Sequence, residues 1–353
     1  IAGRSSCSCS SAAELWMNAR MRDWSTMPKV ELHLHLEGAI PLPTLWELIE
    51  QHGGDETIRT PAELVNWFTY RDFAHFMETW VWMIGFLRSY EDFTCASEAV
   101  ARHLASQNIV YAESFFSPSD FRHRDLDPQH LAIAIRTGLD RVPEVEVPLI
   151  VDLVRDRGPK GSARTLAAIT EVAGEARVIG IGIGGYEAEN PPELFADVYR
   201  TARNSGFRLT AHAGEAAGPE SVWGAINALG VERIGHGVRA AEDPALVDYL
   251  VEHQTPLEVC PTSNIRTAVV SDWETHPARQ LIEAGAMVTI NTDDPALFHS
   301  SLAGEYEVLQ ERFGLEEDAI RRISRAAVEA SWAPAETKAR LTGSLNAWWD
   351  AAD

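Results

Sequence analysis

Eight short segments rich in apolar and β-branched residues recur along the chain, separated by longer segments with apolar residues at three- and four-residue steps. The eight are residues 30–34, 109–114, 148–153, 178–183, 209–211, 233–235, 256–259 and 287–291. Alternation of strands and helices predicts a parallel sheet, and eight repeats predict that the sheet closes into a (β/α)8 barrel, the TIM barrel. An open doubly wound sheet is the alternative, but residues 37–41 (EGAIP) lack the glycine-rich phosphate loop of that fold.

The interval between the first two predicted strands, residues 40–107, is much longer than an ordinary barrel connection. It has helical periodicity of its own, so we expect extra helices inserted after the first strand. Its aromatic-rich part at 73–86 contains Phe76 and Trp80. Long loops on a barrel are usually lids or binding elements, whereas packing of an additional helical layer would use the same aromatic side chains. Both interpretations stay open at this point.

The chain has enough apolar material for a large core, because 45% of its 353 residues are hydrophobic, and no linker-like segment interrupts 28–350. We therefore expect a single barrel domain at 27–353 and an N-terminal extension at 1–26. The four cysteines form no disulfide framework, and no apolar run is long enough for a signal peptide or a membrane span. These features predict a cytoplasmic protein that does not associate with membranes.

The formal net charge is −22, and the three lysines, Lys29, Lys160 and Lys338, are scattered along the chain. Because a negative surface repels a phosphate backbone, the sequence argues against nucleic acid as a partner. No feature of the sequence indicates an oligomeric state.

Two histidines, His33 and His35, lie two residues apart in the first predicted strand. The period-2 alternation of a strand directs both imidazoles to one side, which in a barrel can be the interior. Neutral imidazole is a good zinc ligand, but this pair alone is a weak signal because surface and core histidines also show the spacing.

Further histidines and carboxylates follow other predicted strands. His212 and Glu215 follow the fifth, His236 follows the sixth, and Asp293 and Asp294 follow the eighth. Barrel enzymes assemble their sites at the C-terminal ends of the strands, and the first and eighth strands are neighbours. We therefore expect all these side chains to converge at one mouth of the barrel.

We infer four ligands for a single metal ion: His33, His35, His212 and Asp293. Nitrogen and oxygen donors with one position left for water suit a catalytic zinc better than magnesium or calcium. Such a metal lowers the pKa of its water and supplies hydroxide near neutral pH. His236 would then orient or deprotonate this water, with a fifth ligand or a core histidine as its alternative roles.

Glu215 lies three residues beyond His212, where the predicted strand passes into a loop. A carboxyl group at this place can face a substrate without binding the metal, so we expect Glu215 to donate a proton. Burial and neighbouring carboxylates would keep it protonated near neutral pH. A charge at a helix N-terminus is the alternative role.

The chain resembles the adenosine deaminase family, which comprises zinc-dependent purine deaminases of the amidohydrolase superfamily. The resemblance spans about residues 28–345 and rests on motifs in matching order: KVELHLHLEGA at 29–39, TAHAGE at 210–215, RIGHG at 233–237, CPTSN at 260–264 and TDDP at 292–295. It implies a (β/α)8 barrel with one zinc ion. It also implies hydrolytic deamination at purine C6, which gives the 6-oxo product and ammonia through a zinc-bound hydroxide.

Carried over position by position, the resemblance implies the same four metal ligands and assigns the catalytic residues. Glu215 becomes the donor to purine N1, and His236 becomes the partner of the hydroxide. Asp294 bonds N7, and the backbone N–H of Gly185 meets N3.

The outer pocket departs from the family pattern. Glu37 stands where adenosine-selective members carry an Asp that holds the ribose 5′-hydroxyl, and residues 182–186 read GIGGY instead of DLAGD. Residues 113–116 read ESFF in place of ExRY or ExRF. Phe76 and Trp80 align with the hydrophobic gate over the pocket, so we expect them and Glu37 to contact the substrate.

The expected substrate is adenosine or a close nucleoside relative, with 6-aminodeoxyfutalosine and adenine as alternatives that occur in the same family. A binuclear centre is disfavoured because no lysine lies between Lys160 and Lys338 to bridge two metals. A non-catalytic zinc-binding barrel is the alternative from a different class, which the presence of Glu215 and His236 disfavours.

Overall fold

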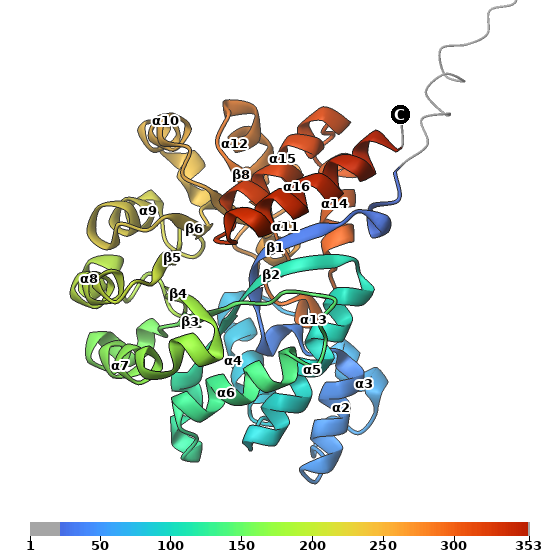
Figure 1. Ribbon diagram of the computed structural model, residues 1–353, viewed down its shortest axis with the longest axis vertical. Helices are drawn as coiled ribbons and strands as arrows, with labels where there is room; N and C mark the ends of the chain where they lie inside the picture. Colours follow the sequence, from blue (N-terminus) through green and yellow to red (C-terminus); the bar gives the residue numbers. More distant parts are fainter. Residues whose placement is uncertain (1–21, 352–353) are drawn as a thin grey trace, which may run out of the picture.

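The computed structural model describes residues 22–351 and contains a parallel eight-stranded barrel. The strands pair in chain order: β1 (Lys29–His35), β2 (Ile109–Phe116), β3 (Leu149–Asp152), β4 (Val178–Gly182), β5 (Arg208–Ala213), β6 (Arg233–His236), β7 (Leu257–Val259) and β8 (Val288–Ile290). Each strand coincides with one of the eight predicted segments. The predicted barrel is therefore confirmed (Figure 1).

The barrel closes just beyond β8, at a residue that the sequence identified as a metal ligand. Asp293 donates its backbone N–H to the carbonyl oxygen of His33 and accepts from the N–H of His35, both at 2.9 Å. The side chain of Asn291 adds a third link, because its Oδ1 accepts from the N–H of Leu32 at 2.9 Å. The seam of the barrel thus fixes Asp293 against β1.

Helices surround the barrel and connect its strands (Figure 1). They are α6 (Pro128–Leu139), α7 (Gly158–Ala176), α8 (Ala196–Asn204), α9 (Pro219–Gly224), α10 (Pro244–His253), α11 (Pro261–Arg266), α12 (Ala278–Ala284), α13 (Pro295–Phe298), α14 (Leu302–Glu311), α15 (Glu317–Ala330) and α16 (Ala335–Asp350). None of the helices in the described part of the chain has the length and apolar character needed to cross a membrane.

Four helices occupy the long interval between β1 and β2, as predicted: α2 (Leu42–Gln51), α3 (Pro61–Trp67), α4 (Phe73–Ile84) and α5 (Tyr90–Ser106). Helix α4 begins at Asp72, whose side chain accepts a hydrogen bond from the N–H of His75 at 2.9 Å. Its buried face carries Phe76, Trp80 and Met83. These positions are three or four residues apart, so they share one side of the helix.

The N-terminal end of the barrel interior contains a network of buried charges. Arg233 lies between two carboxylates, with Nη1 2.6 Å from Glu113 Oε2 and Nε 2.6 Å from Glu258 Oε1. The indole ring of Trp332 covers the guanidinium at 3.6 Å, and Tyr111 donates its hydroxyl to Glu113 Oε1 at 2.9 Å. Opposite charges are paired throughout this network.

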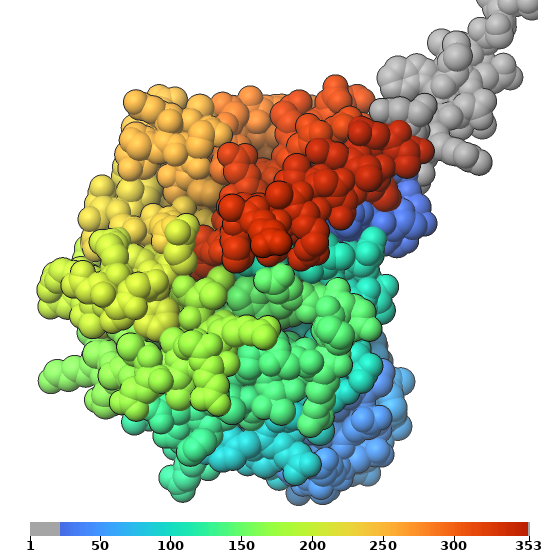
Figure 2. Space-filling view, viewed as in Figure 1, coloured from blue at the N-terminus to red at the C-terminus, as the bar shows by residue number. Residues whose placement is uncertain are grey.

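The predicted extension at 1–26 falls mostly outside the described residues, and its last part packs on the barrel. Trp24 is buried in η1 (Trp24–Thr26), and its ring centroid lies 5.9 Å from that of Trp349 in α16. Lys29 donates its ammonium group to the carbonyl oxygen of Trp24 at 2.9 Å. Figure 2 shows the C-terminal helices in red against this blue N-terminal segment. The division of the chain at residue 27 stays a prediction.

Candidate active site

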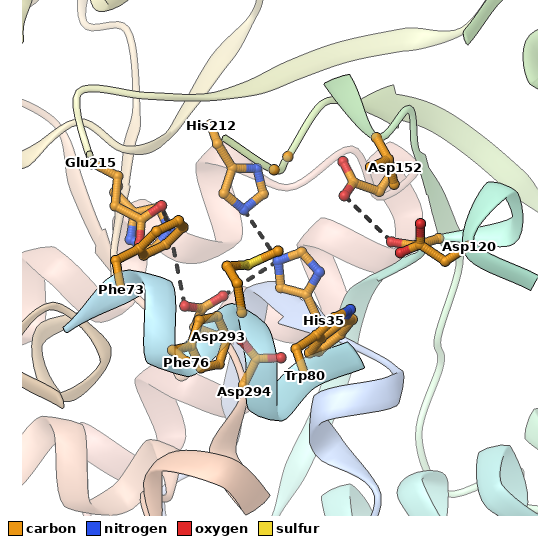
Figure 3. Close-up of a pocket in the computed structure, with 16 residues that line it drawn as sticks. His35, Phe73, Phe76, Trp80, Asp120, Asp152, His212, Glu215, Asp293 and Asp294 are labelled. Atoms are coloured by element: carbon orange, nitrogen blue, oxygen red, sulfur yellow. Dashed lines mark hydrogen bonds and ion pairs between the residues drawn. The ribbon is translucent and has the colours of Figure 1, made fainter. Parts of the chain in front are cut away.

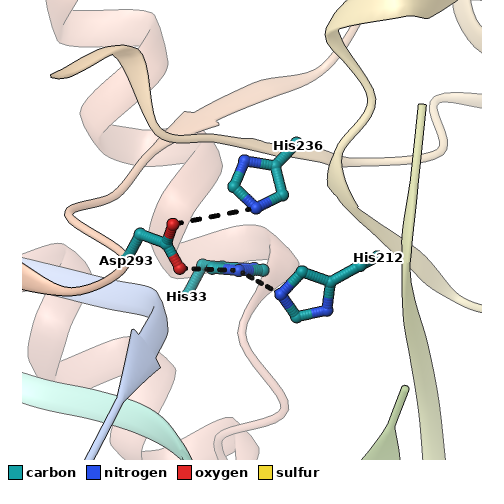
Figure 4. A group of neighbouring side chains, drawn as sticks. All are labelled: His33, His212, His236 and Asp293. Atoms are coloured by element: carbon teal, nitrogen blue, oxygen red, sulfur yellow. Dashed lines mark hydrogen bonds and ion pairs between the residues drawn. The ribbon is translucent and has the colours of Figure 1, made fainter. Parts of the chain in front are cut away.

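Five side chains able to bind a metal converge at the C-terminal ends of the strands: His33, His35, His212, His236 and Asp293. All five are buried. Single donor atoms of four of them, without His35, lie within 4.8 Å of one another (Figure 4). The structure therefore brings together the residues that the sequence predicted to meet.

The spacing of the four predicted ligands fits a tetrahedral ion. His212 Nε2 lies 3.0 Å from His33 Nε2 and 3.1 Å from His35 Nε2. Asp293 Oδ1 lies 3.5 Å from His33 Nε2 and 3.3 Å from His35 Nε2. Four donors at about 2.0–2.1 Å from a tetrahedral zinc are about 3.3–3.4 Å apart. Three imidazoles and one carboxylate at this spacing suit zinc.

His236 stands slightly apart from these four. Its Nε2 lies 3.9 Å from Asp293 Oδ2 and 3.7 Å from Glu215 Oε2, and it makes no hydrogen bond. Its Nδ1 lies 3.1 Å from the side-chain amide of Asn264. With the amide oxygen accepting from Nδ1–H, Nε2 is the proton-accepting nitrogen of the neutral ring. The geometry matches a histidine that exchanges a proton beside the metal ligands, although His236 belongs to the same compact donor group.

Neighbouring side chains orient the ligands. Glu258 Oε2 lies 2.8 Å from His33 Nδ1, so this carboxylate directs the Nε2 of the ring toward the other ligands. Ser263 donates its hydroxyl to Asp293 Oδ2 at 2.6 Å, which leaves Oδ1 facing the histidines. Asp293 and His236 both have left-handed backbone angles, with φ of 65° and 58°. Such angles are costly for residues other than glycine and cluster at functional sites.

The electrostatics of the cluster favour a bound cation. Burial lowers the pKa of His35 to about 4 and that of His236 to about 3, so both rings are neutral. Burial acts in the same direction on His33, but hydrogen bonds and charges from Asp293 and Glu258 outweigh it and raise its pKa to about 10. Positive charge is therefore stabilised beside Asp293, where a metal ion would supply it.

Glu215 lies at the edge of this cluster on a loop that a second carboxylate holds in place. The carboxylate of Glu187 accepts hydrogen bonds from four consecutive backbone N–H groups, those of residues 214–217, at 2.6–3.2 Å. Burial, the charge of Asp293 and the charge of Glu187 raise the pKa of Glu215 well above its usual value. Both effects favour the protonated form of Glu215, and Glu187 fixes the loop that carries it.

Asp294 follows the predicted ligand Asp293, and similar effects favour its protonated form. Burial and the charge of Asp293 raise its pKa well above the usual value, and its Oδ1 has no hydrogen-bond partner. A Cβ at Gly38 would overlap the Asp294 carboxyl group, so this position requires glycine. The arrangement presents Asp294 as a hydrogen-bond donor to a ligand.

These groups form one end of a cavity of about 520 Å³ (Figure 3). One wall is apolar and comes mainly from α4, with Phe76 and Trp80 as expected and with Phe73 and Met77 beside them. The backbone of Gly184 and Gly185, after β4, lies along the cavity too. An apolar wall with a few convergent polar groups is typical of small-molecule sites.

Two of the departures in sequence, at β2 and β4, compensate each other. The ring of Phe115 in β2 stacks on His35 with centroids 5.0 Å apart. A Cβ at Gly182 would come within 2.6 Å of the Phe115 ring. The glycine in β4 therefore makes room for the aromatic ring in β2, which packs directly on two of the ligand histidines.

Glu37 does not line the cavity. The short helix η2 (Glu37–Ala39) turns its side chain behind Ser117, where Oε1 accepts from the N–H of Ser117 at 3.0 Å, and the residue is 1% exposed. Ser117, Asp120 and Asp152 line the cavity at this end instead. The sequence analysis identified none of these three, because no motif marks them and their contacts depend on loop conformation.

The family model for adenosine deaminase matches residues 28–348. An aminodeoxyfutalosine deaminase from Streptomyces avermitilis is 34% identical over 327 residues, which cover 91% of each chain. An adenine deaminase structure from Arthrobacter aurescens superposes with a TM-score of 0.85 at 29% identity, covering 92% of this chain and all of that one. An amidohydrolase from Burkholderia ambifaria, crystallised with bound zinc, has a TM-score of 0.83 at 27% identity, covering 95% and 98% of the two chains.

Proposed function

The chain belongs to the adenosine deaminase family and is a hydrolytic aminohydrolase; within that class we propose that it deaminates a 6-aminopurine nucleoside, adenosine or a close relative. The products would be the 6-oxopurine nucleoside and ammonia. The observation that carries the proposal is the convergence of five side chains able to bind a metal with the carboxyl groups of Glu215 and Asp294, whose protonated forms are favoured, in one cavity.

One zinc ion per chain, held by His33, His35, His212 and Asp293, is part of the proposal. The donor set and its spacing support it, as does the bound zinc of the related amidohydrolase. A zinc ion held there would act as a Lewis acid and would lower the pKa of water enough to provide hydroxide at neutral pH.

The protein's own groups then handle the purine ring and its protons. Glu215 donates the proton of its carboxyl group to N1, which makes C6 electrophilic. His236 Nε2 takes one proton from the attacking water and passes it to the amino group, so that the C6–N bond breaks and ammonia leaves. The remaining hydroxyl proton on C6 returns to the Glu215 carboxylate as the 6-oxo group forms. Asp294 donates a hydrogen bond to N7, and the N–H of Gly185 donates to N3. The apolar wall with Phe76 and Trp80 packs on the ring.

The cavity disfavours nucleotides. Within the described residues, the lining of the cavity contains no lysine or arginine. It contains five carboxyl groups, those of Asp120, Asp152, Glu215, Asp293 and Asp294. A substrate phosphate would find no basic side chain in this lining to pair with. We therefore expect adenosine to be a much better substrate than its monophosphate.

Aminodeoxyfutalosine is the second candidate, favoured by the 34% identity to a deaminase of that name. The deciding experiment compares kcat/KM of the zinc-loaded protein for adenosine, adenine and aminodeoxyfutalosine, followed by ultraviolet absorbance and ammonia release. Adenosine is expected to lead. If kcat/KM for either of the others exceeds that for adenosine more than tenfold, equivalent to about 1.4 kcal/mol, that compound would take the place of adenosine as the proposed substrate. The proposed deamination chemistry would stay the same. Zinc binding without turnover of any aminopurine would support a binding protein instead.

A further inference from the structure

A second group of polar side chains lies at the other end of the cavity from Glu215, and the proposed chemistry at C6 does not use it. Asp152 is the last residue of β3, Ser117 follows β2, and Asp120 lies in η3 (Pro118–Arg124). Figure 3 places Asp152 and Asp120 together, with His35 and Trp80 between them and Glu215. All three side chains line the cavity.

One oxygen atom in this group has no partner in the protein. Asp152 Oδ2 accepts from the hydroxyl of Ser117 at 3.4 Å, whereas Oδ1 is buried without a hydrogen bond, and the residue is 4% exposed. Asp120 is already held by Arg157 Nη2 at 3.0 Å. A buried acceptor without a donor costs about 1–3 kcal/mol. Asp152 Oδ1 is therefore suited to accept a hydrogen bond from a bound molecule.

The surroundings select the kind of donor. Burial and the charge of Asp120 raise the pKa of Asp152 to about 7, and Glu37 adds a further carboxyl group behind Ser117. An anionic group would be repelled here, whereas an uncharged hydroxyl can donate to the acceptor without a charge of its own to desolvate.

The position of this group relative to the purine identifies the substituent. Asp152 lies against the glycine backbone after β4, because a Cβ at Gly184 would be 2.7 Å from Asp152 Oδ2. The next residue, Gly185, is the proposed donor to purine N3. Since N3 and N9 are both bonded to C4, a substituent on N9 would start beside Asp152.

We propose that Asp152, supported by Ser117 and Asp120, is the recognition site for an uncharged, hydroxyl-bearing substituent on purine N9, with a sugar hydroxyl donating to Asp152 Oδ1. The inference rests on the proposed purine deamination, and it makes the nucleoside, rather than the free base, the substrate class.

The test measures kcat/KM for adenosine and for adenine with the wild-type zinc enzyme and with Asp152→Ala. We expect the variant to lose at least tenfold on adenosine and to change less than about twofold on adenine. Asp197→Ala removes an exposed carboxylate from α8 and serves as the charge control, with both values unchanged. Zinc content and circular dichroism confirm that each variant is folded and loaded.

Adenosine analogues that lack the 2′-, 3′- or 5′-hydroxyl locate the contact. For the analogue that lacks the recognised hydroxyl, the kcat/KM of the wild-type enzyme should fall as far as Asp152→Ala lowers it for adenosine. Asp152→Ala should then cause no further fall in kcat/KM for that analogue. Equal losses on adenosine and adenine, or a wild-type preference for adenine, would overturn the recognition site. If the wild-type enzyme turns over neither compound, the proposed function fails, and calorimetric binding of adenosine and adenine to wild type and Asp152→Ala decides the recognition site separately.

Discussion

The two ends of the barrel interior both bury charged side chains, but in opposite arrangements. At the N-terminal end, Arg233 lies between Glu113 and Glu258, so opposite charges neutralise one another. At the C-terminal end, the carboxyl groups of Glu215 and Asp294 lie near Asp293, and burial and like charge raise their pKa values. Paired charges are typical of a buried network that stabilises the fold, whereas carboxyl groups with raised pKa values are typical of a catalytic site.

This difference has a consequence for stability. Substitution of one member of a buried ion pair lowers the free energy of unfolding strongly, because the charge of its partner is left uncompensated. Crowding of buried carboxyl groups costs free energy that protonation relieves only in part, so removal of one such group leaves the fold intact or more stable. Substitutions at the two ends should therefore separate activity from stability.

The largest effect is expected from loss of a metal ligand. Asp293→Ala removes the only carboxylate among the four predicted ligands, together with its contacts to His33 and His35. We expect zinc content and deaminase activity to disappear together, as measured by elemental analysis and ammonia release. A variant that keeps full activity without zinc would show that the metal is not needed.

The next effect is expected from Glu215→Gln, which removes the dissociable proton and nearly preserves the shape of the side chain. Turnover should fall by about 10²–10⁴-fold, the range for a lost general acid, while zinc binding stays intact. The melting temperature should be unchanged or higher, because a crowded carboxyl group is gone. Glu220→Gln, at an exposed position of α9, is the matched control. Near-normal kcat in Glu215→Gln would assign proton donation to another group.

The N-terminal end should respond in the opposite way. Arg233→Met leaves Glu113 and Glu258 buried without their partner, and we expect a loss of about 3–5 kcal/mol in the free energy of unfolding. Arg208→Met, which breaks an exposed pair with Glu232, should cost no more than about 1 kcal/mol. Denaturant unfolding measures both. Equal losses in the two variants would contradict the contrast between the ends of the barrel.

A smaller effect concerns the pH dependence of stability. Burial, with the charges of Asp120 and Asp152 adding to it, raises the pKa of Glu37 from 4.5 to about 7 in the folded protein. The folded state then binds more protons than the unfolded state between these values, so this stability is present below pH 4.5 and is lost as pH rises through 7. Glu37→Gln should remove this decline, which amounts to about 3 kcal/mol, in the metal-free protein. Identical slopes in both proteins would place the titration elsewhere.

The fold follows from the sequence because alternating strand and helix periods are local properties. All eight strands appear where apolar segments predicted them, and the helices after β1 appear in the long interval. The convergence of the predicted ligand histidines also follows from local pattern, since His33 and His35 lie two residues apart on one strand and strand C-termini share one face.

The supporting residues could not be found in this way, because their contacts join distant segments. Glu258 reaches His33 across 225 positions of sequence, and Glu187 reaches the loop of Glu215 across 28. Nothing in the local sequence distinguishes these glutamates from surface charges. Glu37 shows the converse case: its place after His35 suggested a substrate contact, but one helical turn moves it behind Ser117.

The proposed deamination requires one metal ion at the C-terminal end of the barrel. Elemental analysis and adenosine deamination, measured before chelation, after exhaustive chelation and after return of one equivalent of zinc, test it most directly. We expect about one zinc per chain, loss of activity on chelation and recovery on return of zinc. Two metal ions per chain, or full activity after exhaustive chelation, would contradict it.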